Sequence, residues 1–134
     1  MKKHILMIGA GGTIASKQTE HGLAPGLTSS DILSYLPHVE DVCTVDTLQV
    51  CNIDSTNMNP GHWKLITQTI EQHYEEYDGF VICHGTDTLT YTAAALSYMI
   101  QNSPQPIVIT GAQPPLNMDV TDGKTKLPSS FIYA

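Results

Sequence analysis

The residues best suited to chemistry lie in two short segments that place hydroxyl groups directly after glycines. Residues 9–13 read GAGGT and end on Thr13, and residues 84–88 read HGTDT, with Thr86 beside Asp87. Glycines let a backbone approach a ligand closely, and the amides that follow can hold an anion. A threonine hydroxyl is a weak nucleophile unless a base and an oxyanion-binding site assist it. The two segments supply part of that machinery, without a general base tuned to neutral pH.

Each polar segment also has a purely structural explanation. Asp87 or Thr88 is suited to cap the helix that follows, and the glycines of residues 9–12 are typical of a tight turn. A third segment, Asp54 with Ser55 and Thr56, is typical of a side-chain-stabilised turn. Its functional interpretation is a hydroxyl and backbone amides that hold a small carboxylate.

Several other kinds of site are disfavoured by the same residues. The dinucleotide fingerprint needs a glycine at position 14, where Ile14 stands, and no Gly-Lys-Ser/Thr follows to make a phosphate loop. The six histidines are scattered, without metal-ligand spacing, so we expect neither a metal nor a cofactor. His84 precedes the glycine of its segment, and we expect its ring to support the loop rather than act as a base.

Composition narrows the class further. The 134 residues have the length of one domain, and 41% are hydrophobic, enough for a core. Six lysines, no arginine and thirteen acids give a net charge of −7, which disfavours nucleic acid and anionic membranes as partners. No run of 18 apolar residues is present, and the apolar run at residues 5–8 is too short for a secretion signal. Three cysteines without CxxC spacing favour free thiols, so we expect a cytoplasmic protein.

The positioning elements follow from the alternation of apolar runs with helical patterns. Strands are predicted at residues 4–9, 45–53, 80–83 and 107–109. A helix is predicted at residues 29–36, capped within residues 29–31 and ended by Pro37. A second helix is predicted after the Asn59–Pro60 cap, with an apolar stripe of Trp63, Ile66, Ile70 and Tyr74. Two more helices are predicted, one at residues 88–100 and one that begins near Pro128 or Ser129. This order predicts an α/β domain with a mostly parallel, Rossmann/flavodoxin-like sheet flanked by helices.

A parallel sheet brings the polar segments together. Ligands bind beyond the carboxyl ends of parallel strands, and the loops at residues 9–13, 52–56, 84–88 and 110–113 each follow a predicted strand. We therefore expect Thr13 and Thr86 to lie at one edge of the sheet and to face a common hollow.

These segments, taken in order, resemble the bacterial-type L-asparaginase family, in its cytosolic type I-like form. The resemblance rests on residues 11–15 (GGTIA), on Asp54-Ser55, on residues 84–88 and on residues 110–112 (TGA). The family also includes glutaminase-asparaginases and an amidotransferase subunit that acts on misacylated tRNA. It implies that residues 1–134 form an incomplete N-terminal domain of a two-domain asparaginase, with the smaller C-terminal domain absent. Ending on Phe131-Ile132-Tyr133-Ala134, which look like core residues, is consistent with a truncated chain.

The resemblance implies a role for each matching residue. Hydrolysis of L-asparagine to L-aspartate and ammonia would pass through an acyl intermediate on Thr13, with Thr86 as the second catalytic threonine. The implied substrate contacts are Asp87 for the α-ammonium, Ser55 with Asp54 and Thr56 for the α-carboxylate, Gly85 in the second threonine segment, and the carbonyl of Ala112 facing the released amide. Charge-assisted hydrogen bonds would thereby hold both ends of a small zwitterion.

The chain departs from the family pattern in two places. The lid after the first strand carries a tyrosine in the family, whereas the matching residues 20–26 place Leu23 there. The family's catalytic lysine lies beyond residue 134, and neither Lys124 nor Lys126 matches it. We therefore expect the full-length protein, a homodimer or homotetramer by resemblance, to be active and the 134-residue chain alone to be nearly inactive.

Other functions fit parts of the same pattern. Glutamine hydrolysis or a tRNA-amidotransferase amidase would use similar loops, because one methylene changes binding by only about 1–3 kcal/mol. A non-catalytic fragment that binds a small amino acid would use the Asp54 and Asp87 loops without chemistry. A nucleotide-binding domain is the third alternative, and the failed glycine fingerprint counts against it.

Overall fold

A four-stranded parallel sheet forms the centre of the computed structural model, which describes residues 1–36, 38–116 and 122–134 and omits the side chains of residues 18 and 23–25. Its strands are β1 (Lys3–Gly11), β4 (Cys43–Ile53), β5 (Gly79–Cys83) and β6 (Ile107–Thr110), in the spatial order β4-β1-β5-β6. All neighbouring pairs are parallel. The α/β prediction is confirmed.

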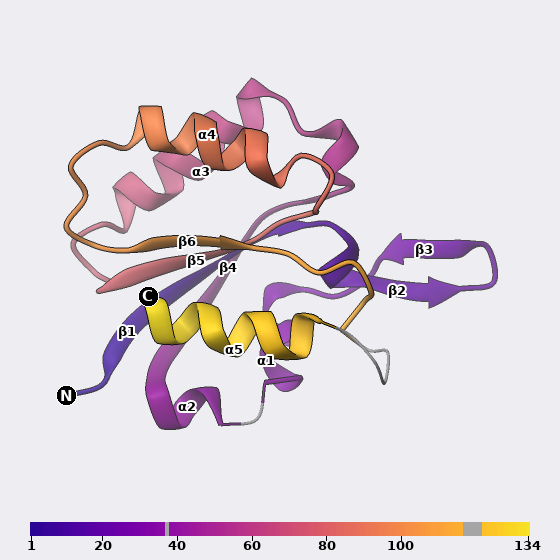
Figure 1. The fold of residues 1–134 in the computed structure, drawn as a ribbon, viewed down its shortest axis with the longest axis horizontal. Helices are drawn as coiled ribbons and strands as arrows, with labels where there is room; N and C mark the ends of the chain where they lie inside the picture. The colour runs from indigo at the N-terminus through magenta and orange to yellow at the C-terminus, as the bar shows by residue number, and fades with distance from the viewer. Residues whose placement is uncertain (37, 117–121) are drawn as a thin grey trace.

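Helices cover both faces of the sheet (Figure 1). One face carries α3 (Pro60–Gln72) and α4 (Leu89–Met99), and the other carries α1 (Ser29–Ser34), α2 (Val39–Val42) and α5 (Gly123–Tyr133). A hairpin of β2 (Ser16–Thr19) and β3 (Gly22–Pro25) extends past the carboxyl ends of the sheet strands. Within the described residues, no helix has the length and apolar character needed to span a membrane.

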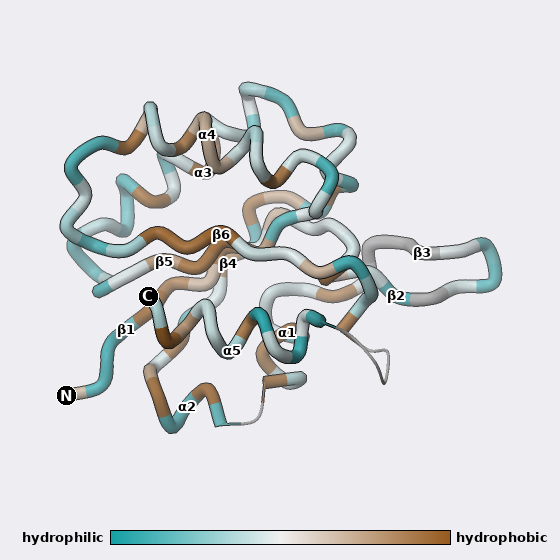
Figure 2. The backbone as a smooth tube through the Cα atoms, viewed as in Figure 1, coloured by the Kyte–Doolittle hydropathy of each residue, from teal (hydrophilic) through white to brown (hydrophobic). Residues whose placement is uncertain are grey.

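Two cores result because successive residues of a strand point to opposite faces. Along β1, Ile5 and Met7 pack with α1, α2 and α5 residues, while Leu6 and Ile8 pack with α3 and α4 residues. Figure 2 shows the hydrophobic residues concentrated on the central strands between the two helix layers. Burial on both faces explains why these strands read as continuous apolar runs.

The helix starts follow local side-chain chemistry. Asn59 caps α3 as predicted, since its side chain accepts a hydrogen bond from the Gly61 amide at 2.9 Å, with Pro60 at the first helical position. The cap of α1 is Thr28 rather than residues 29–31, in a capping box with Asp31. Hydrogen bonds from Thr28 hold the pKa of the Asp31 carboxyl below its usual value.

The last helix starts earlier than predicted. The prediction near Pro128 or Ser129 is wrong, because α5 begins at Gly123 and contains Pro128 in its interior. Leu127 and Phe131 lie four positions apart and pack into the core, which holds the helix through the proline. The hairpin and α2 were also not predicted as elements. The expected stop at Pro37 lies outside the described residues.

Candidate active site

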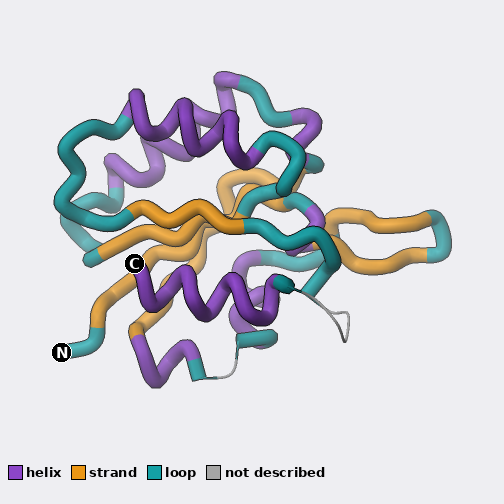
Figure 3. Tube along the Cα trace, viewed as in Figure 1, coloured by secondary structure: helices purple, strands orange, loops and turns teal. Residues whose placement is uncertain are grey.

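The carboxyl ends of the four strands are level with one another. In the sheet register, Gly9 of β1 lies opposite Cys83 of β5, and Cys83 lies opposite Thr110 of β6. At the other side of β1, Gly11 lies opposite Ile53 of β4. The four following loops therefore leave the sheet at one edge, beside the base of the β2–β3 hairpin (Figure 3).

A small cavity of about 140 Å³ opens between these loops. Its lining residues come from three of the four loops and from the start of β2: Gly12, Thr13, Ser16, Asp54, Ser55, Thr86 and Asp87. Pockets for drug-sized ligands measure roughly 300–1,000 Å³, so this one suits a small ligand. Thr13 and Thr86, from separate loops, face the same hollow.

Glycines bring the loop backbones into direct contact. A Cβ on Gly12 would lie 2.3 Å from the Cα of Gly85, and a Cβ on Gly85 would lie 2.5 Å from the Cβ of Ser55. Gly12 also has a φ of +82°, in the region that side-chain-bearing residues avoid. The sequence places glycine at both positions because the loops can meet only without side chains.

Hydrogen bonds join the same loops. The Gly12 amide donates to the Ile53 carbonyl at 2.9 Å. The Thr88 hydroxyl donates to the Ser55 carbonyl at 2.7 Å, which links the start of α4 to the loop after β4. Although Thr88 is the N-cap residue of α4, its side chain makes no capping bond, so the capping explanation fails for Thr88.

The Asp54 side chain has the turn role that sequence reasoning offered as an alternative. Its Oδ1 atom accepts hydrogen bonds from the amide and the hydroxyl of Thr56, at 2.9 and 3.0 Å. This turn leads into the short 3-10 helix η2 (Ser55–Asn57) and leaves Ser55 buried against Gly85. The turn and a ligand-binding role are compatible, because Asp54 also lines the cavity.

His84 is the first residue of the second threonine segment (residues 84–88) and is fully buried. Its Nδ1 atom donates to the Gly85 carbonyl at 2.6 Å, and its Nε2 atom lies 2.8 Å from the Thr92 hydroxyl. Burial lowers the pKa of the imidazole, which keeps the ring neutral near pH 7. The prediction that this ring supports the loop is confirmed by both contacts.

A family model for the N-terminal asparaginase domain matches residues 4–134. The chain belongs to the asparaginase N-terminal domain family. It is 41% identical over 131 residues to an L-asparaginase of Thermococcus kodakarensis, and the aligned region covers 97% of this chain and 40% of that relative. It is also 40% identical over 135 residues to a subunit of the glutamyl-tRNA(Gln) amidotransferase of Methanosphaera stadtmanae, covering 96% of this chain and 30% of that protein.

Solved asparaginase structures share the fold. L-asparaginase I of Vibrio cholerae superposes with a TM-score of 0.90 at 35% identity, over 100% of this chain and 42% of that one. The predicted N-terminal asparaginase fold is thereby confirmed. The asparaginase domain described here spans about 40% of the length of the L-asparaginases that it matches.

The asparaginase domain brings together most of the residues singled out in the sequence. Thr13, Asp54, Ser55, Thr86 and Asp87 line the cavity. Three others do not line it: Gly85 and Ala112 are buried, and Thr56 is exposed and bonded to Asp54.

Two residues at or beside the cavity of this asparaginase domain were not predicted from the sequence. Ser16 lines the cavity and donates to the Gly12 carbonyl at 3.0 Å. Gln113 donates from Nε2 to the Thr86 hydroxyl at 3.1 Å. A hydroxyl three residues after Thr13 was the only sequence signal for Ser16, whereas the Gln113 contact depends on the strand order.

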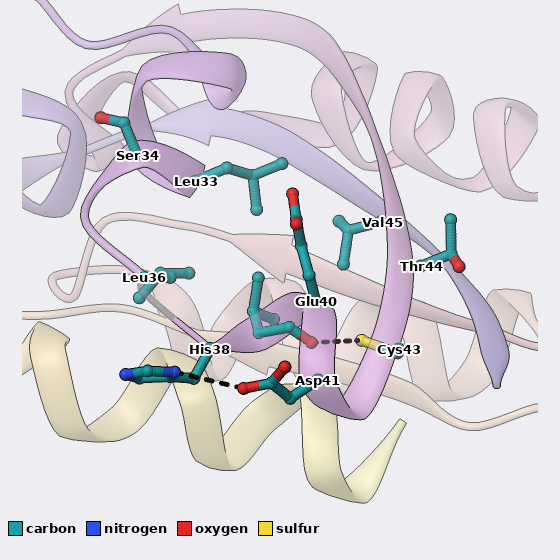
Figure 4. A pocket seen from close by; sticks show the side chains of 10 residues that line it. Leu33, Ser34, Leu36, His38, Glu40, Asp41, Cys43, Thr44 and Val45 are labelled. Atoms are coloured by element: carbon teal, nitrogen blue, oxygen red, sulfur yellow. Dashed lines mark hydrogen bonds and ion pairs between the residues drawn. The ribbon is translucent and has the colours of Figure 1, made fainter.

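A larger hollow of about 560 Å³ lies away from this edge (Figure 4). It is bounded by α1, α2 and the beginning of β4, with Cys43 donating to the Val39 carbonyl at 3.9 Å and His38 paired with Asp41 at 3.1 Å. Its position at the amino end of β4 separates it from the threonine loops. Among the described residues, no group of three or more His, Cys, Asp or Glu side chains could hold a metal ion.

Proposed function

We propose that the protein carrying this domain hydrolyses L-asparagine to L-aspartate and ammonia. The observation that supports it best is the meeting of Thr13 and Thr86 in one small cavity that is also lined by carboxylates, Asp54 and Asp87. A cavity of about 140 Å³ matches a small amino acid better than a peptide or a nucleotide.

In the proposed reaction, the Thr13 hydroxyl oxygen attacks the side-chain amide carbon of asparagine and loses its proton. The carbon–nitrogen bond breaks, the nitrogen takes up a proton and leaves as ammonia, and water then hydrolyses the threonine ester to release L-aspartate. Thr86 is the second catalytic hydroxyl, and the Gln113 amide that donates to it favours loss of its proton. The backbone amide of Thr13, directly after Gly12, is suited to bind the developing oxyanion.

The remaining proposed roles concern substrate binding. The Asp87 carboxylate would pair with the α-ammonium group, and Ser55 with the Asp54–Thr56 turn would hold the α-carboxylate. The Ala112 carbonyl would accept from the departing amide, and Gly85 would contribute to substrate binding by letting Ser55 pack directly against the second threonine loop. The catalytic lysine and the second domain of the family would lie outside residues 1–134.

Two further properties of the whole protein belong to this proposal. A cytoplasmic location is supported by the three unpaired cysteines, Cys43, Cys51 and Cys83, since free thiols are typical of a reducing compartment. A homodimer or homotetramer is supported only by family membership.

A second function has one specific observation in its favour. The chain is about as similar to an amidotransferase subunit named for glutamyl-tRNA(Gln) as to the L-asparaginases, over nearly the same residues. An amidase that supplies ammonia to an acylated tRNA would use the same cavity.

The test is ammonia release by the protein expressed from its complete coding region, with L-asparagine and L-glutamine as substrates. Thr13→Val and Thr86→Val replace each hydroxyl by a methyl group of similar size, and we expect losses of about a thousandfold or more in kcat/KM. Thr90→Val, on an exposed position of α4, is the matched control and should stay within about twofold of the wild type.

The alternatives predict different results. Faster turnover of glutamine, or turnover that needs an acylated tRNA, would favour the second function. Calorimetric binding of L-aspartate without any amide cleavage would replace catalysis by simple amino-acid binding. The 134-residue chain assayed alongside should release ammonia far more slowly than a longer protein, and equal rates would contradict that part of the proposal.

A further inference from the structure

A chain of hydrogen bonds connects the two helices on one face of the sheet to the loop that carries Thr86. The indole nitrogen of Trp63, on α3, donates to the Thr92 hydroxyl at 2.9 Å. Thr92, on α4, lies 2.8 Å from His84 Nε2, and His84 Nδ1 lies 2.6 Å from the Gly85 carbonyl oxygen. His84 and Thr92 are both 0% exposed, so no solvent competes for the two bonds of the His84 ring.

The chemistry of the partners fixes the direction of every bond in this series. A carbonyl oxygen only accepts, so Nδ1 of His84 carries the proton that the Gly85 oxygen receives. A neutral ring then has a lone pair at Nε2, which accepts a hydrogen bond from the Thr92 hydroxyl. The Thr92 oxygen in turn accepts from the Trp63 N–H, which can only donate. Burial lowers the pKa of His84, in agreement with a neutral ring.

This direction leaves His84 unable to act as a base toward substrate. Its Nδ1 atom is protonated and its Nε2 atom accepts from Thr92, so neither nitrogen can take a proton from Thr86 without breaking a buried bond. The effect of the ring is instead to hold the Gly85 carbonyl. Gly85 lies against Gly12 and Ser55, directly before Thr86.

We propose that Thr92 and Trp63 are positioning residues that act through His84 to hold residues 85–87 in the geometry required for substrate. The inference rests on the proposed amidase function for its kinetic consequence, but the proton arrangement stands independently of activity. Without the Thr92 hydroxyl, His84 Nε2 and the Trp63 N–H both lose their shared partner, and the His84 ring, held only through Nδ1, is free to tilt.

The first experiment measures the His84 tautomer by nitrogen-15 NMR of the imidazole ring in the full protein at about pH 7.5. We expect a neutral ring with the proton on Nδ1. Thr92→Val should shift the amide resonances of Thr86 and Asp87, whereas Thr92→Ser should leave them close to the wild type. A proton on Nε2 in the wild type, or unchanged Thr86 and Asp87 resonances in Thr92→Val, would overturn the proposal.

The second experiment measures kcat and KM for L-asparagine in the same variants. We expect Thr92→Val to lower kcat/KM about tenfold or more, Thr92→Ser to stay within about threefold, and Trp63→Phe to fall between them. A variant that unfolds at a lower temperature yet keeps wild-type kcat and KM would show a merely structural role and contradict the proposal.

The two proposals fail in different ways. If the protein releases no ammonia but the tautomer and the loop resonances behave as expected, only the proposed function is wrong. If the protein is active and Thr92→Val leaves kinetics and loop resonances unchanged, only the positioning role is wrong. Trp63→Phe removes the donor at the surface end of the series, so it replaces Thr92→Val in both comparisons if that variant does not fold.

Discussion

Gly12 and Gly85 meet backbone to backbone at the carboxyl edge of the sheet. An added Cβ on Gly12 would lie 2.3 Å from the Gly85 Cα and 2.4 Å from its amide nitrogen. Each glycine directly precedes a loop hydroxyl, since Thr13 and Thr86 are the next residues along the chain. The distance between the two threonine loops is therefore set by a contact that tolerates no side chain.

Gly12→Ala should destabilise the domain and disable the site. The clash with backbone atoms adds to the strain of a φ of +82°, and we expect a loss of about 2–4 kcal/mol in the free energy of unfolding. Urea denaturation measures the effect. Gly22→Ala is the matched control, because Gly22 also has a positive φ, of +109°, with nothing within 4 Å of the added Cβ.

The difference between these two variants isolates the loop contact. Gly22→Ala should cost only about 1–2 kcal/mol, from backbone strain alone. Equal losses in the two variants would mean that the Gly12–Gly85 contact adds nothing to stability.

Thr88→Val should loosen the connection between α4 and the loop after β4. The Thr88 hydroxyl donates to the Ser55 carbonyl at 2.7 Å, and its removal should cost about 1 kcal/mol of stability and raise KM for the small-molecule substrate more than it lowers kcat. Thr88→Ser keeps the donor and should restore KM. A Thr88→Ser variant that behaves like Thr88→Val would assign the effect to the methyl group instead.

Stability should fall at mildly acidic pH because of His84. Burial lowers the pKa of His84 in the folded protein below the usual value of about 6.5. Just below pH 6.5, the imidazole is therefore protonated in the unfolded chain but still neutral in the folded one. The contribution of His84 to stability is therefore greatest above about pH 6.5. As the pH falls toward the lower folded-state pKa, the free energy of unfolding decreases by at most about 1.4 kcal/mol per pH unit.

The measurement is urea denaturation from about pH 5 to pH 8, on the wild type and on His84→Asn. Asparagine does not titrate, and its amide can still donate to the Gly85 carbonyl. The two proteins differ at this position alone, so the difference between the two curves belongs to His84. Parallel curves would show that His84 is protonated equally in the folded and unfolded states.

Much of the fold followed from local pattern alone. The strands at residues 4–9 and 80–83 were predictable because burial on both faces demands continuous apolar runs, and the start of α3 because Asn59 and Pro60 satisfy its first amides locally. The start of α5 was not predictable, since Pro128 is a local stop signal that the packing of Leu127 and Phe131 overrides.

The residue types of the candidate site were likewise visible in the sequence: two threonines after glycines, an Asp-Ser-Thr turn and a Thr-Asp pair. Which of these groups face one another was decided by the strand order β4-β1-β5-β6, because it places the loops after β4 and β5 on either side of the loop after β1. The contact of Gly12 with Gly85, the bond from Gln113 to Thr86 and the bond from Trp63 to Thr92 all join residues far apart in the chain. Local sequence carries no signal for such contacts, since they form only when separate strands and helices pack together.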